Sequence, residues 1–549
     1  MLTTDTQTLT LTGAKIILKT LKSLGVDTIF GYPGGIVLSV YDELFKQKDI
    51  KHILMRHEQS AVHAAEGYAR VSGKCGVVLV TSGPGATNTV TGIANAYLDG
   101  YPLVVLTGQV SAELIGKDAF QEVNIIDMTK SCTKANYQVT DISDLKYTLE
   151  RAFHTAMSGK QGPVVVDLAK NIFSQSAVYT PSMVFAQEVT CCAEEDIKKA
   201  LAEICSAQRP VIVAGGGIVQ SGAFKKVKEF AELLNIPVVN TMMGLGTYPQ
   251  DSFNYLGMIG IFGQISANRT VRESDLIFSI GARFNDRVTC CFQNGELSRK
   301  FIQLDINPYE ISRIIPAYLS LVGDAANVIN KMIEELHTGN YLCNHNHKLW
   351  LQQAVGYKNN NKKNQKISDK LHSFEVIQKI CEITTHMEPV VATEVGQHQL
   401  WTAQNFRFSK PRQFLTSGGA GTMGFGLPAA IGGCIADISK PVICISGDGS
   451  FQMNSQELAV CKDYNLPVKI FVLNNGYLGM VRQLQQNLCG ARFSETAISN
   501  PDFLKLAEAY GIKGIRVESE DEIVPALKSV FEEKGPVLVD FIIEPMEVV

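Results

Sequence analysis

Residues 447–475 read GDGSFQMNSQELAVCKDYNLPVKIFVLNN and decide the fold of this chain. The apolar, partly β-branched residues 442–446 before them predict a buried parallel strand, and the GDG lets the backbone turn sharply where that strand ends. Residues 452–464 have a helical composition, a Pro-containing segment interrupts it, and residues 468–473 predict a second strand that ends at Asn474-Asn475. We therefore predict a βαβ unit.

The two strand ends bring metal-binding side chains together. Asp448 and Asn475 follow neighbouring parallel strands, and open α/β sheets bind ligands at the carboxyl ends of their strands, where a helix amino terminus can bind phosphate. Mg²⁺ prefers an octahedron of oxygens, so we expect Asp448, Asn475, a main-chain carbonyl near Tyr477, diphosphate and water as its ligands. GDG alone would more often be an ordinary tight turn. The Asn pair at the next strand end favours the magnesium-diphosphate site.

A second motif lies nearer the N-terminus. Glu58 stands in the segment RHEQ, residues 56–59, after the apolar residues 53–55 and at the start of a helical stretch over residues 58–71. By itself Glu58 would be a helix-capping acid. Together, the two motifs resemble the signature of thiamine-diphosphate enzymes. In that group a glutamate of the first domain contacts the aminopyrimidine ring of the cofactor, so that its amine removes the thiazolium proton.

Length and composition agree with a large enzyme. The chain has 549 residues, which predicts about three domains of roughly 150 to 200 residues each. Its net charge of -4 without a basic run argues against nucleic-acid binding, and no apolar run of about 18 residues predicts a membrane span. Residues 1–12 resemble neither a signal nor a transit peptide, so we expect a cytoplasmic location. The thirteen cysteines, including the pairs Cys191-Cys192 and Cys290-Cys291, lack metal-ligand spacing and predict reduced thiols.

Apolar strands alternate with helical stretches along the chain, which predicts an α/β fold of three doubly wound parallel-sheet domains. VVLVTSGPGATN and VICISGDGSFQMN, each followed by another apolar strand, echo one another and indicate that the first and last domains share an ancestry. Thr12 is expected to cap a first helix over residues 13–24. We place a pyrimidine-binding domain at residues 8–176, a middle domain at 193–337, a polar linker at 338–370 and a diphosphate- and Mg-binding domain at 371–549.

Further motifs narrow the resemblance to one family and cover nearly the whole chain. In combination they are similar to the catalytic subunit of acetohydroxyacid synthase, also called acetolactate synthase. The motifs are FGYPGG (30–35), TSGPGATN (81–88), IGKDAFQE (115–122), GPVVVDLAK (162–170), GARFNDRVT (281–289), EVGQHQLW (394–401) and GTMGFGLPAA (421–430).

The resemblance implies a function. Members of this family decarboxylate pyruvate on thiamine diphosphate with Mg²⁺ and join the two-carbon unit to a second 2-keto acid, in branched-chain amino-acid biosynthesis. They are homodimers or tetramers with active sites at the subunit interface, so Glu58 of one subunit would serve the diphosphate bound by the other. A separate regulatory small subunit is compatible with the sequence. Three alternatives remain: a carboligase with another acceptor, a pyruvate oxidase or decarboxylase on the same fold, and a non-catalytic binding or scaffold protein.

The same resemblance assigns roles to five catalytic residues. Met423 matches the side chain that bends the cofactor, although a methionine is more often ordinary core. Arg287 matches the arginine that binds the carboxylate of the second keto acid, a task suited to a planar guanidinium, although it could instead form a surface ion pair. Lys170 by itself would be a solvated loop lysine. Glu58, Gln121 and Lys170 belong to the first domain, together with the pocket residue Phe120.

The remaining site residues match the family's cofactor contacts. Those for thiamine diphosphate and its metal are Gly34, Gly35, Pro84, Asn88, Val395, Gly396, Gln397, His398, Gly421, Met423, Gly447, Asp448, Gly449, Ser450, Asn475, Tyr477 and Met480. Those for FAD, which has no net redox role in such synthases, are Gly215, Gly216, Gly217, Thr241, Met242, Met243, Gly281, Arg283, Asp305 and Asp324.

Several departures from the family pattern matter. GIFG at residues 260–263, Asn285-Asp286 and Lys160 differ from the usual flavin-domain sequence, so flavin is expected but is less firmly indicated than thiamine diphosphate. Leu484 stands where a tryptophan lines the second-substrate pocket, beside Met480. One methylene contact contributes roughly 1 to 3 kcal/mol of discrimination. Without the indole we expect weak preference for 2-ketobutyrate, and hence mainly 2-acetolactate from two pyruvates.

Overall fold

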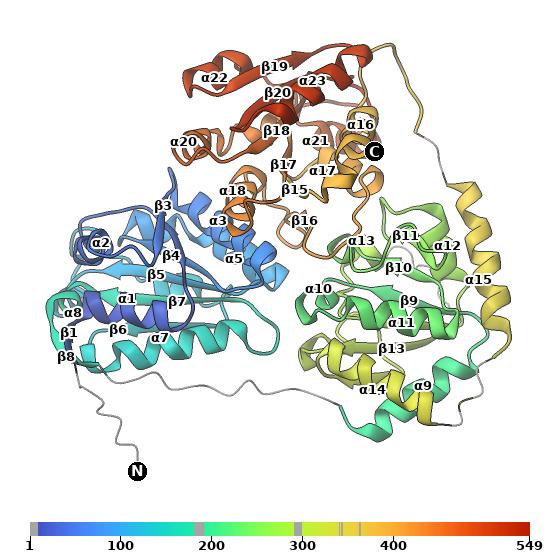
Figure 1. Cartoon of the computed structure of the whole chain (residues 1–549), viewed down its shortest axis with the longest axis horizontal. Coiled ribbons are helices and arrows are strands. Elements are labelled where there is room, and N and C mark those ends of the chain that lie inside the picture. The colour runs from blue at the N-terminus through green and yellow to red at the C-terminus, as the bar shows by residue number, and fades with distance from the viewer. Residues whose placement is uncertain (1–8, 180–191, 290–298, 340, 342–343, 362–363) are drawn as a thin grey trace.

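The computed structural model describes residues 9–179, 192–289, 299–339, 341, 344–361 and 364–549. Within them the chain forms three lobes, each built on a six-stranded sheet (Figure 1). Strand pairing in all three sheets is parallel and helices cover the sheets, which confirms the predicted fold class. Cys191, Cys290 and Cys291 lie outside the described residues.

The N-terminal sheet has the strand order β3-β2-β4-β5-β7-β6. Its central strands are completely buried because helices pack on both faces, which explains their continuous apolar sequences. Thr12 does precede the first helix, but its side chain makes no capping hydrogen bond, so that part of the prediction was wrong. The elements are β2 (Thr28–Gly31), β3 (Lys51–Leu54), β4 (Gly76–Val80), β5 (Leu103–Gln109), β6 (Ala135–Val139), β7 (Pro163–Ala169), α1 (Gly13–Ser23), α2 (Leu38–Phe45), α3 (Glu58–Ser72), α5 (Val90–Asp99), α7 (Ile142–Met157) and α8 (Lys170–Ser174).

The C-terminal sheet repeats this order as β16-β15-β17-β18-β20-β19, so both sheets place their second, first, third, fourth, sixth and fifth strands side by side. The sequence echo between the two domains therefore has a structural counterpart. The helix predicted over residues 452–464 is shorter than expected: a 3₁₀ turn η7 and the helix α20 occupy its later part, and the short helix α19 precedes it. The elements are β15 (Val390–Thr393), β16 (Phe414–Leu415), β17 (Val442–Gly447), β18 (Val468–Asn474), β19 (Lys513–Val517), β20 (Val537–Ile542), α16 (Ser373–Thr384), α17 (Gln397–Asn405), α18 (Gly426–Ala436), α19 (Asp448–Phe451), η7 (Ser455–Glu457), α20 (Leu458–Asp463) and α21 (Gly479–Leu488).

The middle sheet has another topology, β11-β10-β9-β12-β13-β14. Counted along the chain this is the order 3-2-1-4-5-6 of dinucleotide-binding sheets, whose ligands bind where the order reverses, between β9 and β12. The elements are β9 (Pro210–Ala214), β10 (Val238–Asn240), β11 (Tyr255–Met258), β12 (Leu276–Ile280), β13 (Lys300–Asp305), β14 (Leu319–Val322), α9 (Glu194–Ser206), α11 (Phe224–Leu234), α12 (Ile265–Glu273) and α14 (Ala325–Thr338).

The stretch predicted as a linker, residues 338–370, is partly folded onto the middle domain. It contains α15 (Asn346–Gly356), from which Trp350 and Ala354 are buried in an apolar cluster with strands of the middle sheet. Trp350 Nε1 donates a 2.9 Å hydrogen bond to the Pro210 carbonyl. The helix was not predicted because the segment is mostly polar and its few apolar residues lie on one side.

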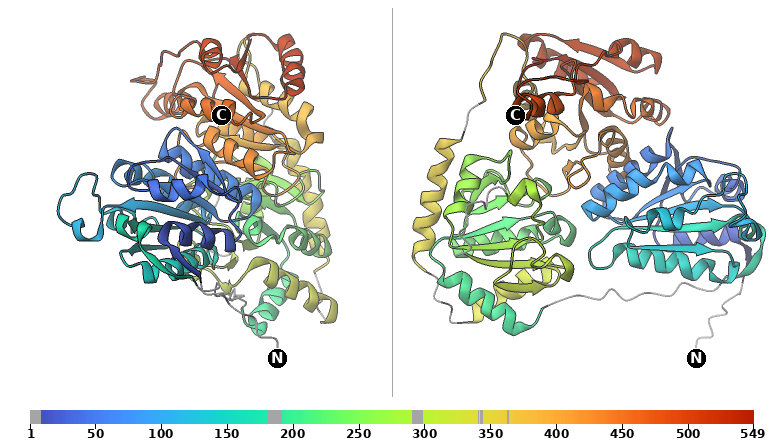
Figure 2. Two further views of the ribbon diagram at one scale, coloured as in Figure 1. Left: turned by 60° about the vertical axis from the view of Figure 1, so that its left-hand side comes forward. Right: turned by 180° about the vertical axis from the view of Figure 1, so that it is seen from behind.

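Helices α3 and α18 join the two terminal domains (Figures 1 and 2). Their backbones touch: a Cβ placed at Gly67 would lie 2.1 Å from the Ala429 carbonyl oxygen, and one at Gly432 would lie 1.8 Å from that of Ala64. Glycine and alanine are therefore required at this crossing. Because α3 begins at Glu58, the crossing fixes where the predicted catalytic acid lies.

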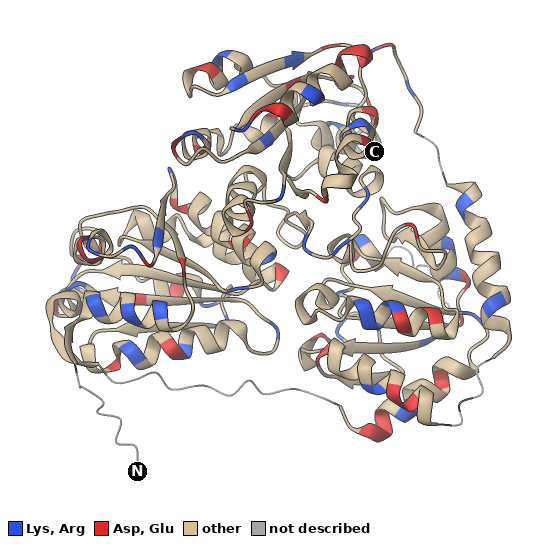
Figure 3. Ribbon diagram, in the orientation of Figure 1, with Lys and Arg blue, Asp and Glu red and all other residues tan. Residues whose placement is uncertain are grey.

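Lysine, arginine, aspartate and glutamate are interspersed over all three lobes (Figure 3). None of the described helices combines the length and the apolar character needed to cross a membrane.

Candidate active site

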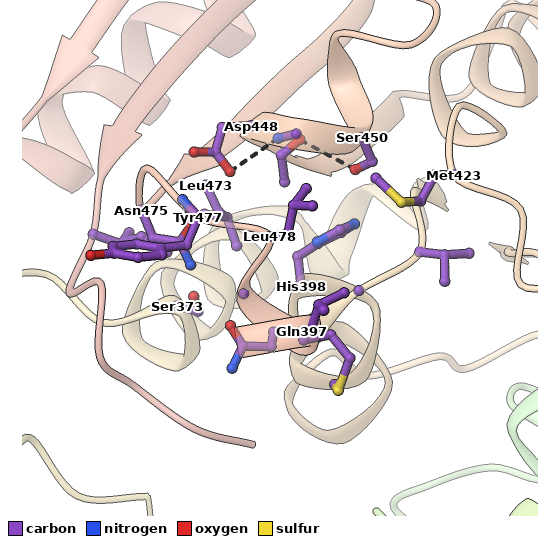
Figure 4. Close-up of a pocket in the computed structure, with 18 residues that line it drawn as sticks. Ser373, Gln397, His398, Met423, Asp448, Ser450, Leu473, Asn475, Tyr477 and Leu478 are labelled. Atoms are coloured by element: carbon purple, nitrogen blue, oxygen red, sulfur yellow. Dashed lines mark hydrogen bonds between the residues drawn. The ribbon is translucent and has the colours of Figure 1, made fainter. Parts of the chain in front are cut away.

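A small pocket of about 70 Å³ lies at the carboxyl ends of β15, β17 and β18 (Figure 4). All of its lining residues belong to the last domain. They include twelve of the predicted cofactor and metal residues: Val395, Gly396, Gln397, His398, Met423, Gly447, Asp448, Gly449, Ser450, Asn475, Tyr477 and Met480.

The predicted metal ligands meet at one end of this pocket, opposite Met423 (Figure 4). Asp448 is almost completely buried, and its Oδ2 accepts hydrogen bonds from Gly476 N (2.8 Å) and Asn500 Nδ2 (2.7 Å). Asn475 Oδ1 accepts from Tyr477 N at 3.0 Å, which fixes the turn after β18. Burial raises the pKa of Asp448, and the hydrogen bonds from Asn500 and Gly476 oppose that rise. A cation beside it would favour the ionised carboxylate.

The described residues contain no group of three or more His, Cys, Asp or Glu side chains that could hold a metal ion. One carboxylate, one amide and a main-chain carbonyl supply only part of an octahedron. A divalent ion bound here would therefore take its other ligands from an anionic cofactor and water.

His398 lines the same pocket in a neutral form. Burial lowers its pKa to about 3, and its Nε2 is buried without a hydrogen-bond partner among the described residues. The backbone of Gly447 lies against the ring, so a Cβ there would approach Nδ1 to 2.8 Å. An unpartnered imidazole nitrogen beside a glycine cradle at a strand end fits the binding of a phosphate group.

Glu394, the first residue of the EVGQHQ motif, fixes the backbone that follows Met423. Glu394 is fully buried and accepts hydrogen bonds from Gly424 N (2.6 Å) and Leu427 N (3.2 Å) at the start of α18. Burial raises its pKa to about 7, while these main-chain donors favour the ionised form. The backbone directly after Met423 is thereby fixed.

A second cluster of predicted residues lies in the N-terminal domain, at the equivalent end of its sheet. Glu58 Oε2 accepts a 2.9 Å hydrogen bond from Asn88 Nδ2. A Cβ at Gly85 would lie 3.5 Å from Glu58 Oε1, and one at Gly83 would lie 3.0 Å from Gln121 Cβ. A Cβ at Gly34 would lie only 2.4 Å from Thr81 Cβ, and the Thr81 hydroxyl is buried without a partner among the described residues. Gly35 and Pro84 adjoin this cluster in sequence.

A much larger cavity of about 1180 Å³, here called the junction cavity, lies where the three domains meet. Val395, Gly396 and Met480 line both this cavity and the small pocket, so the two are adjacent. Most of the residues predicted for the flavin line it: Gly216, Gly217, Thr241, Met242, Met243, Gly281, Arg283, Asp305 and Asp324.

The glycines at this cavity stand at the switch point of the middle sheet. Gly217 N donates to the Gly281 carbonyl at 2.9 Å, and a Cβ on either residue would approach the other to within 2.7 Å. Gly215 does not line the cavity; it packs against Ala282 instead, so its role is close packing rather than ligand contact. Burial raises the pKa of Asp305, at the end of β13, to about 6. A tight glycine turn with an acid at a later strand end suits a dinucleotide.

The predicted acceptor residues divide into two groups. Arg287, Met480 and Leu484 line the large cavity, and Gly421 lies in its wall near Val395. Phe120 is 88% exposed and Lys170 is also exposed. Both lie on the N-terminal domain, and neither lines the small pocket or the large cavity of the same chain. Arg287 has 65% of its side chain exposed and lies 3.5 Å from Asp286.

Comparison with known proteins covers all three domains. Family models match residues 11–128 as the N-terminal TPP binding domain, 197–332 as the central domain and 394–541 as the C-terminal TPP binding domain of thiamine pyrophosphate enzymes. The acetolactate synthase large subunit of Haemophilus influenzae is 40% identical over 546 residues, which cover 98% of this chain and 95% of the relative. The isozyme 3 large subunit of Escherichia coli is 41% identical (95% and 92% covered), and the acetolactate synthase of Mycobacterium bovis 42% (97% and 88% covered).

The chain belongs to the acetolactate synthase large-subunit family. Its two terminal domains are thiamine-diphosphate-binding domains. The buried His398 nitrogen, the glycine cradle and the Asp448–Asn475 pair fit the diphosphate end of that cofactor. Thr81, Asn88 and Glu58 form a separate group of hydrogen-bonding side chains on the first domain.

Some residues of this site in the acetolactate synthase-family chain were not predicted from the sequence. Ser373, Leu478, Gly479 and Ile543 line the pocket, and Asn500 orients Asp448. Gly479 directly precedes Met480, a predicted site residue, and could have been found. Ser373 and Asn500 stand in segments without a distinguishing pattern, and only the folded chain brings them to the strand ends.

Proposed function

We propose that this chain is the catalytic subunit of an acetolactate synthase that converts two pyruvates to 2-acetolactate and carbon dioxide in branched-chain amino-acid biosynthesis. One observation supports this most directly: the predicted cofactor pocket shares Val395, Gly396 and Met480 with a cavity that also presents Arg287. A plain decarboxylase needs room for one keto acid, whereas a carboligase needs an adjoining site for the second.

The side chains have distinct tasks in this proposal. Bound thiamine diphosphate would supply a carbon nucleophile for the keto carbon of pyruvate and a cationic ring that accepts the electron pair left by decarboxylation. Glu58 would hold a proton at the pyrimidine, Met423 would fill space beside the cofactor, and Asp448 with Asn475 would hold Mg²⁺. Arg287 orients the carboxylate of the acceptor, and Leu484 and Met480 wall its alkyl end.

We propose that the active site is shared between two copies of the chain. All residues of the diphosphate pocket come from the last domain, whereas Glu58, Asn88 and Gln121 form a separate cluster in the first. A homodimer, or a tetramer of two such dimers, would pair the cluster of one subunit with the pocket of the other. Phe120 and Lys170, exposed in the single chain, would then face the partner's acceptor site.

We also propose that the junction cavity binds FAD without a net redox role. The strand order of the middle sheet, the contact between Gly217 and Gly281, and Asp305 at a strand end support a dinucleotide. Flavin released from purified protein by heat would appear as fluorescence at one equivalent per chain. A colourless protein that takes up no FAD would contradict this part.

The activity is tested with pyruvate, thiamine diphosphate and Mg²⁺. Acid treatment should convert the product to acetoin, which gives a colour reaction, and chelation of Mg²⁺ should abolish it. Release of acetate or acetaldehyde without acetoin would instead identify an oxidase or a decarboxylase. The relatives are named large subunits, and we propose that a separate small subunit can bind; a co-purified second chain that alters the rate would support this.

A further inference from the structure

Glu457 is a buried carboxylate outside the cofactor pocket that the proposed mechanism does not use. It ends the 3₁₀ turn η7, nine residues after Asp448, and its side chain is fully buried. Both of its oxygens accept from the main-chain nitrogen of Arg56, at 3.2 and 3.1 Å. Arg56 stands two residues before Glu58, where α3 begins.

The contact crosses from the last domain to the first within one chain. The first main-chain N–H groups of a helix have no partner inside the helix and carry partial positive charge, so a carboxylate there fixes the helix start. The main-chain N–H of His57 and the Ser60 hydroxyl lie close enough to Glu457 to oppose the rise in its pKa that burial causes. Its oxygens therefore engage residues on both sides of Glu58.

A neighbouring amide strengthens the connection. Ser60 Oγ donates to Asn454 Oδ1 at 3.0 Å, and Asn454 Nδ2 donates to the Gly424 carbonyl at 2.5 Å. Asn454 and Glu457 are joined through Glu457 N and the Asn454 carbonyl, at 3.1 Å. The start of α3 is thus anchored on a rigid, buried support.

We propose that Glu457 is a positioning residue for the catalytic acid Glu58. The inference rests on the proposed function, and in the proposed dimer it has a specific consequence. The Asp448 and Met423 of a chain serve one active site, whereas its Glu58 serves the other. Glu457 therefore lies in the metal-binding segment of one site but acts on the acid of the second.

The test measures the step that depends on Glu58. Holoenzyme with thiamine diphosphate and Mg²⁺ is placed in deuterium oxide, quenched with acid, and the exchange of the cofactor's acidic ring proton is followed by NMR. E457Q removes one acceptor and places an amide against Arg56 N–H, and should slow exchange about 10- to 100-fold, the effect of a misplacement near 1 Å. Binding of thiamine diphosphate should remain.

Tyr464 provides the matched control. Its hydroxyl also accepts a hydrogen bond across the domains, from Leu54 N at 2.9 Å, but it contacts β3 rather than the start of α3. Y464F should exchange at the wild-type rate. Equal rates in E457Q and Y464F would overturn the inference. Should E457Q fail to fold, S60A removes one hydrogen bond of the same support and should also slow exchange; a wild-type rate in S60A would then overturn it.

Mixed dimers separate the two chains. When one chain carries E58Q, a single working site remains, built from Glu58 of the unmodified chain. E457Q should slow exchange only when it is placed in the chain with intact Glu58. An effect that follows the other chain, or equal effects in both, would contradict the inference. A wild-type protein that binds no thiamine diphosphate would instead refute the proposed function itself.

Discussion

Leu484 sets the width of the acceptor site at the scale of a single residue. It lies on α21, lines the junction cavity and is 41% exposed. A leucine leaves more room there than an indole. The extra methylene of 2-ketobutyrate therefore contacts fewer atoms and contributes little to acceptor binding. The proposed preference for pyruvate rests on this position.

The substitution L484W should therefore raise the ratio of 2-aceto-2-hydroxybutyrate to acetolactate by about 10-fold when both keto acids compete at equal concentration. Leu488, one turn further along α21 and 78% exposed, does not line the cavity and supplies the control. L488W should leave the ratio unchanged. A strong excess of 2-aceto-2-hydroxybutyrate from the unmodified protein would contradict the proposal.

Single residues also show how far sequence can reach. Asp448 and Asn475 could be predicted because each directly follows an apolar strand, and parallel strands bring such ends together. Asn500 could not, because its segment has no periodicity and reaches Asp448 only through the folded loop. Nor could Glu457, since its partner lies 401 residues away in sequence.

At the scale of elements, the α3–α18 crossing depends on glycine. G432A would place a methyl group 1.8 Å from the Ala64 carbonyl oxygen, so one helix must move. We expect a loss of about 1 to 3 kcal/mol in the free energy of unfolding, measured in denaturant. G356A, at the end of α15 with nothing within 4 Å of its added carbon, should be neutral or slightly stabilising. Equal stability of both variants would show that the crossing is loose.

The C-terminal segment, which packs on α16 and α21, should make stability depend on pH. Glu547 is 4% exposed, burial raises its pKa to about 7, and it accepts from Ser373 N at 3.0 Å. Because the native state then binds more protons than the unfolded chain, its contribution to stability is complete below about pH 4.5 and is lost as the pH rises through 7, by about 3 kcal/mol.

E547Q should remove this part of the pH dependence. The unfolding free energy of wild type relative to E547Q should fall between pH 4.5 and 7. Glu544 is the control: burial opposes ionisation, but hydrogen bonds from the Ser368 hydroxyl and Met546 N hold its pKa below the usual range. E544Q should change the profile in the opposite sense, at lower pH. Parallel wild-type and E547Q profiles would contradict the assignment.

Strands were predicted better than helices at this scale. Continuous β-branched runs mark β4, β5, β7, β17 and β18 because both faces of each sheet are covered. The helix α15 was missed because a few buried side chains, Trp350 among them, suffice to hold it against the middle domain. The α-helix expected over residues 452–464 begins only at Leu458, and Asn454 and Glu457 before it hydrogen bond to the neighbouring domain.

At the scale of the whole molecule, shared active sites make a direct prediction. Neither E58Q nor D448N should be active as a homodimer. In a mixed dimer, however, the Glu58 of the D448N chain and the Asp448 of the E58Q chain form one intact site. Coexpression in equal amounts should restore about a quarter of the wild-type activity, since half of the dimers are mixed and each has one working site. No recovery in dimers shown to be mixed would place each site within one chain.

The family resemblance predicts two half-sites that serve different active sites, but the sequence does not show which contact holds them in place within one chain. Motif matching assigns Glu58 and Asp448 to one cofactor because both are needed for its chemistry. Their arrangement depends on the α3–α18 crossing, whose small residues give no sign of which face meets which partner.

Residues of all three domains line the junction cavity. A molecule bound there contacts all three domains and must dissociate before any of them unfolds, so it stabilises the whole chain. Heating the loaded protein should give one cooperative melting transition that moves upward with the concentration of the occupant. Without the occupant, we expect the middle domain to melt separately from the two terminal domains, whose interiors meet at the α3–α18 crossing.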